Sequence, residues 1–124
     1  MIQRIPPGTM DLFVEVGQLC RDADAFIAER SKVTSPLVKV QMFERAMEWM
    51  DKLQALQQRI NVRRDELTTE LRQMNANWEA APAAATADRQ AALPLERLEQ
   101  IYRIFSYIAR WSEQINERIV QLAI

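Results

Sequence analysis

Two rows of apolar residues, spaced alternately three and four apart, constrain this chain most. The first row comprises Phe43, Ala46, Met50, Leu53, Ile60, Leu67, Leu71, Met74 and Trp78. The second comprises Leu98, Ile101, Phe105, Ile108, Ile115, Ile119 and Leu122. Rows with this spacing lie on one face of a helix and are buried only when they pack against other helices. The sequence therefore predicts an all-α fold: an antiparallel three-helix bundle with a long central helix and coiled-coil-like seams, completed by oligomerisation or by a partner.

The first helix is expected over residues 10–31, after an extended lead-in over residues 1–9. Thr9 is a suitable N-cap, and Asp11 in the first turn complements the helix dipole. The apolar stripe of this helix comprises Leu12, Phe13, Val16, Leu19, Cys20, Ala23, Phe26 and Ile27.

The central helix is expected over residues 36–78, because Ser35 and Pro36 form a strong start and no glycine or proline follows before Trp78. Its first half carries extra apolar residues, enough to contact two neighbouring helices: Val40, Met42, Met47 and Trp49. Gln57 and Arg64 share the heptad position of Phe43. Such polar residues either fix the register of the helices or mark a locally open seam from which Arg64 extends to water. A kink near Asn61 is a further alternative.

The alanine-rich stretch over residues 79–93 is predicted to be a linker, since Pro82 ends the preceding helix. The last helix is expected over residues 94–122. At 124 residues the chain is long enough for one helical domain with a core of its own.

Composition argues against an enzyme. The sequence has no histidine, the usual general base at neutral pH, and only two glycines, so it lacks a phosphate-binding glycine-rich loop. No catalytic residue, cofactor, metal or small-molecule substrate is therefore expected. The carboxylate pairs that could face one another in a bundle are not matched by the histidines of di-iron sites; they are Glu44 with Glu48, Glu66 with Glu70, and Glu113 with Glu117. Lys52 is the expected helix partner of Glu48.

The chain is expected to lie in the cytoplasm and not in a membrane. No segment approaches the roughly 18 consecutive apolar residues that span a bilayer, and Pro6, Pro7 and Gly8 interrupt the place of a signal-peptide core. Export without a leader stays an open alternative. Cys20, the single cysteine, is predicted to be a buried small hydrophobic residue, which suits a reducing compartment.

The predicted function is a protein–protein interaction module, such as an adaptor, an assembly component or a small chaperone. Its partners would be another protein, copies of itself, or both. Methionine and tryptophan supply adaptable and large apolar contacts, although a tryptophan beside a seam can equally close the edge of a core. The predicted protein-binding residues are Met42, Met47, Trp49, Met50 and Trp111.

The alternative function is a helical subunit of a nucleoprotein complex. The central helix carries the one local excess of positive charge, and these side chains could contact a nucleic-acid backbone or an acidic partner: Arg59, Arg63, Arg64 and Arg72. Nucleic acid is the less favoured partner, because the chain has 16 basic and 17 acidic residues and Asp65, Glu66 and Glu70 alternate with the arginines. A solvated helix face with internal ion pairs is the simpler interpretation.

Overall fold

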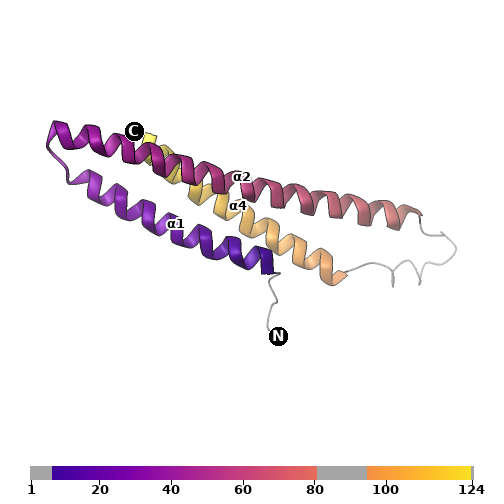
Figure 1. The fold of residues 1–124 in the computed structure, drawn as a ribbon. Helices are drawn as coiled ribbons and strands as arrows, with labels where there is room; N and C mark the ends of the chain where they lie inside the picture. Colours follow the sequence, from indigo (N-terminus) through magenta and orange to yellow (C-terminus); the bar gives the residue numbers. More distant parts are fainter. Residues whose placement is uncertain (1–6, 81–94, 124) are drawn as a thin grey trace.

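The computed structural model describes residues 7–80 and 95–123, and within these ranges the chain is a bundle of three helices without a strand. The helices are α1 (Pro7–Ser31), α2 (Pro36–Ala80) and α4 (Leu95–Ala123). Figure 1 shows α1 and α4 lying along the length of α2, which is the longest of the three. The all-α helical bundle predicted from the apolar rows is therefore confirmed.

The helix starts follow the prolines. α1 begins at Pro7, so Thr9 lies inside the first turn, and its predicted position as the N-cap is wrong. Residues 1–6 of the predicted lead-in lie outside the described residues. Proline suits the first helical position, because the N–H it lacks has no partner there. α2 begins at Pro36, as predicted, and the N–H of Lys39 donates to the Ser35 carbonyl at 2.9 Å.

α2 is a continuous helix through Asn61, where a break or a kink was the alternative. It extends two residues beyond the predicted end, to Ala80, and α4 begins at Leu95, whereas residue 94, the predicted start of the last helix, lies outside the described residues. The remainder of the predicted linker, residues 81–93, lies outside the described residues.

The interior of the bundle lies between α2 and its two neighbours. Its central row on α2 is Leu53, Ile60 and Leu67, all of them fully buried. Met42, Ala46 and Leu56 of α2 are also buried. The other buried apolar side chains come from α1 and α4: Leu12, Val16, Cys20, Ala23, Phe26, Ile101, Ile104, Ile108, Trp111, Ile115 and Leu122.

Two phenylalanines assigned to buried stripes from the sequence are exposed. Phe43 was placed in the seam of the central helix, but α2 packs between α1 and α4 on the face of Met42 and Ala46, which turns Phe43 outward. Phe13 was placed in the stripe of the first helix, but its ring lies at the edge of the α1–α4 contact, against Trp111.

Polar contacts between helices set their alignment. Arg97 of α4 forms a two-pronged ion pair with Glu70 of α2, with N–O distances of 2.5 and 2.8 Å. Gln57 of α2 donates from Nε2 to the Ser112 hydroxyl of α4 at 3.0 Å. Such paired and directional bonds are sensitive to a shift of one residue, so they fix the register of α2 against α4.

α1 is held against α4 in the same way. Arg118 of α4 binds both carboxylate oxygens of Asp24 at 2.9 Å. Arg30, near the end of α1, donates to the carbonyls of Gln121 and Leu122, near the end of α4. These are among the carbonyls that a helix C-terminus leaves without an internal partner, so Arg30 acts as a capping side chain.

Replacing Ile60 by alanine should lower the free energy of unfolding by about 2–5 kcal/mol, since a buried isoleucine is lost and a cavity is left. Val62, two residues along the same helix, is the matched control because it is 57% exposed whereas Ile60 is fully buried. Val62→Ala should change stability by less than about 0.5 kcal/mol. Urea unfolding of both variants measures the difference, and equal effects would contradict the assigned interior of α2.

Glu70→Gln should reveal a pH-dependent ion pair. The hydrogen bond from Arg97 lowers the pKa of Glu70 below its ordinary value, so the pair stabilises the fold above that value and is lost as falling pH protonates Glu70. We expect Glu70→Gln to cost at most about 1 kcal/mol at pH 7, since the pair is partly exposed.

The difference between wild type and Glu70→Gln should shrink as the pH falls below about 4.5. Urea unfolding at a series of pH values measures it. Glu113→Gln, at an exposed glutamate without an arginine partner among the described residues, is the control. If the difference in the free energy of unfolding between wild type and Glu70→Gln stayed constant down to acid pH, the charge of Glu70 would contribute nothing to stability.

Candidate protein-interaction surfaces

One face of the first half of α2 exposes large apolar side chains. Val40, Phe43 and Met47, which we call the α2 stripe, are 62%, 63% and 48% exposed. Their spacing of three and four residues aligns them on one side of the helix, next to half-buried Met50. A single exposed apolar residue is ordinary, but an aligned group is typical of an interaction site.

Charge is distributed unevenly around this stripe. Exposed Glu44, Glu48 and Asp51 form no ion pair with a residue in the described ranges. Lys52, the expected partner of Glu48, instead places its ammonium group 4.7 Å from the centre of the Trp49 ring. The carboxylates beside the α2 stripe therefore keep their negative charge free for other contacts.

The structure does not bring the five predicted protein-binding residues onto one surface. Met47 is exposed and belongs to the α2 stripe, whereas Met42 and Trp111 are buried and unavailable to a partner in this conformation. Trp49 is half-buried and stacks on Phe26 of α1 with ring centres 6.2 Å apart. Met50 is half-buried against the core. The Met and Trp side chains face in two directions, which their residue types alone do not reveal.

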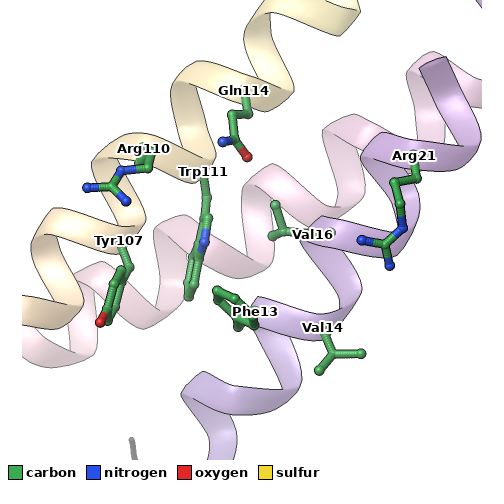
Figure 2. A pocket seen from close by; sticks show the side chains of 9 residues that line it. Phe13, Val14, Val16, Arg21, Tyr107, Arg110, Trp111 and Gln114 are labelled. Carbon is green, nitrogen blue, oxygen red and sulfur yellow. The ribbon is translucent and has the colours of Figure 1, made fainter. Parts of the chain in front are cut away.

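A second surface feature is an aromatic groove between α1 and α4, with a volume of about 390 Å³. Figure 2 shows Phe13, Tyr107 and Trp111 gathered in it, with Arg21 and Arg110 farther out. Trp111 stacks on Tyr107 at 6.0 Å and meets the edge of Phe13 at 6.2 Å, so both of its neighbours already cover it. The lining is apolar, aromatic and cationic and includes no carboxylate, thiol or hydroxyl nucleophile apart from the Tyr107 phenol.

Sequence reasoning missed Phe43 and Val40 as the centre of an exposed surface. The spacing of the apolar residues places Phe43 in the buried seam and Val40 in its widened half. The usable indication was the surplus itself: the first half of α2 has more apolar positions than two neighbouring helices can cover.

The arginines of the alternative function are largely engaged with carboxylates. Arg59 forms an ion pair with Glu15 of α1, which lowers the pKa of Glu15. Arg63 binds Glu66 at 3.1 Å, and Arg64 lies 3.8 Å from Asp65. Arg72 is exposed further along α2. The structure thus distributes these charges among local pairs and does not favour a continuous basic track for a phosphate backbone.

Neither metal ligands nor a membrane span is found in the described part of the chain. No group of three Cys, Asp or Glu side chains there is close enough to hold a metal ion. None of the three helices is sufficiently long and apolar to cross a bilayer.

Comparison with protein-family models, with curated proteins and with solved structures finds no match to this chain. The assignment of function therefore depends on the geometry of the surfaces described above.

Cys20 should resist thiol reagents in the native protein. Its side chain is buried, and burial raises the pKa of the thiol, so little reactive thiolate forms at neutral pH. We expect its reaction with a disulfide reagent such as dithionitrobenzoate to be slow, and to become fast in urea. Reaction in native buffer as fast as in urea would contradict the buried position.

Proposed function

We propose that this chain is a non-enzymatic helical module that binds another protein, or copies of itself, by packing helices together. An adaptor, an assembly component or a small chaperone of the cytoplasm would use such a surface. The observation that carries the proposal is the α2 stripe, three large apolar side chains that are aligned on one helix and 48% to 63% exposed to water.

The proposed architecture is an antiparallel arrangement in which α2 runs against both α1 and α4. It is supported by the order of contacts. Glu70, late in α2, pairs with Arg97, early in α4, whereas Gln57 pairs with Ser112, so later positions on α2 meet earlier positions on α4. The short connection over residues 32–35 between α1 and α2 suits the same order.

Helix lengths support a role that depends on a partner. α2 has 45 residues, whereas α1 has 25 and α4 has 29. α1 and α4 are each too short to cover α2 along its whole length. Each also covers only the side of α2 on which it packs. The α2 stripe is the row that neither neighbour covers, and burying it against a third helix would be favourable.

Site-specific crosslinking tests this proposal. We expect a photoreactive phenylalanine derivative placed at Met47 to form discrete adducts with a protein in the cells that make this chain. The same group placed at Val62, exposed on the same helix but outside the stripe, is the matched control.

The mass of each adduct distinguishes a second copy of this chain from a different protein. Adducts specific to position 47 would support an interaction site at the stripe. No adduct at position 47, or the same adducts at both positions, would refute it.

A further inference from the structure

We propose that the α2 stripe binds a basic amphipathic helix of a partner protein, which lies along α2 and α4 as the fourth helix of the bundle. This inference deepens the proposed function and depends on it, because it names the chemistry of the partner that the stripe recognises.

The shape of the stripe fits a helix. Val40, Phe43, Met47 and half-buried Met50 continue one alternation of four and three residues, which is the spacing that accepts the side chains of a neighbouring helix. At Gln54 the same row becomes polar. The apolar part is thus about 15 Å long at 1.5 Å per residue, which matches about three turns of a partner helix.

α4 supplies the other side of the site. With α2 and α4 aligned by the Gln57–Ser112 and Glu70–Arg97 contacts, Val120 falls level with Met47. Val120 is 59% exposed, so α4 also presents a large apolar side chain to water at this level of the bundle. Figure 1 shows the end of α4 beside the first half of α2, where both helices can contact one added helix.

The charge around this surface indicates a basic partner. Glu44, Glu48 and Asp51 are exposed on α2 beside the stripe. Basic flanking residues on a partner helix would meet these carboxylates next to the apolar row, as flanking charges do in coiled coils.

The cations of the same part of α2 do not cancel this charge. Arg45 lies over the Phe26 ring at 5.1 Å and Lys52 lies over the Trp49 ring, so both extend toward α1 and away from the stripe. Lys39 is the cation of α2 that adjoins the stripe. The margin of the stripe is therefore acidic although the whole chain has a net charge of only −1.

The same charges disfavour a second copy of this chain as the occupant. A two-fold symmetric contact places the same surface on both sides, so two α2 stripes packed together would bring Glu44 and Asp51 near the identical acidic margin of the other copy. Like charges held close together oppose such pairing. A different protein with lysine or arginine beside its apolar row has no such penalty.

Three synthetic helical peptides of about 18 residues, long enough for a marginally stable helix, test the proposal. The first carries leucines at heptad spacing with flanking lysines, and the second carries the same leucines with flanking glutamates. The third has the composition of the first with its leucines scattered around the helix. Fluorescence anisotropy measures their binding to the full chain, and circular dichroism checks the fold of every variant.

We expect the basic peptide to bind at least about tenfold more tightly than the other two. Phe43→Ser should weaken it by about tenfold or more, whereas Val62→Ser, outside the stripe, should leave it unchanged. The triple variant Glu44→Lys, Glu48→Lys and Asp51→Lys should reverse the preference in favour of the acidic peptide. Because the reversal is a gain of binding, loss of folding cannot imitate it.

Equal binding of the basic and acidic peptides, or an unchanged preference in the triple variant, would overturn the basic-helix partner. Tight binding of the scattered peptide would do the same, since it would show charge attraction without helix docking. A wild-type dimer that dissociates in Phe43→Ser would make a second copy the occupant. If the peptides fail but crosslinks at Met47 persist, only this inference falls, whereas loss of both removes the proposed function as well.

Discussion

The structure depends on burying one row of α2, in which Leu53, Ile60 and Leu67 have no exposed surface. Each of the three helices contacts the other two, and the burial of these side chains fixes which side of α2 faces inward. The other sides of α2 are then left facing outward. Because α1 and α4 occupy the inward side in the first half of α2, the surplus apolar side chains there must face water or another protein.

Polar contacts determine the register of α2 against α4, which the burial of apolar side chains does not fix by itself. Leucine and isoleucine rows can slide along one another by a turn at modest cost, but the Glu70–Arg97 pair and the Gln57–Ser112 bond form in one register. Gln57 contributes this specificity at a cost, since its Oε1 is buried without a hydrogen-bond partner among the described residues. A buried polar group that fixes register is a known use of such residues in coiled coils.

Local features of the sequence were enough to predict where the helices lie in the chain. Which side of α2 faces the interior of the bundle could be determined only from the tertiary structure. The start of α2 at Pro36 and its continuity follow from residues within a few positions of one another. Met42 and Phe43 are adjacent and similarly apolar, and only the position of α1 decides that the first is buried and the second exposed. The Glu15–Arg59 pair likewise joins residues whose proximity no local pattern encodes. Of the predicted protein-binding residues, Met47 is exposed on the α2 stripe, whereas Met42 and Trp111 are buried.

The two apolar features of the surface differ in how much a partner could gain from them. In the aromatic groove, Trp111 is only 5% exposed because Phe13 and Tyr107 already cover it, so a ligand would remove little further apolar surface from water. The side chains of the α2 stripe are 48% to 63% exposed and lie on a regular helix that need not rearrange. Since binding free energy comes from surface newly removed from water and is reduced by the cost of ordering, a preformed exposed row is the stronger site. Its acidic margin then selects among the apolar helices that could fill it, because a partner with the wrong flanking charge leaves like charges face to face.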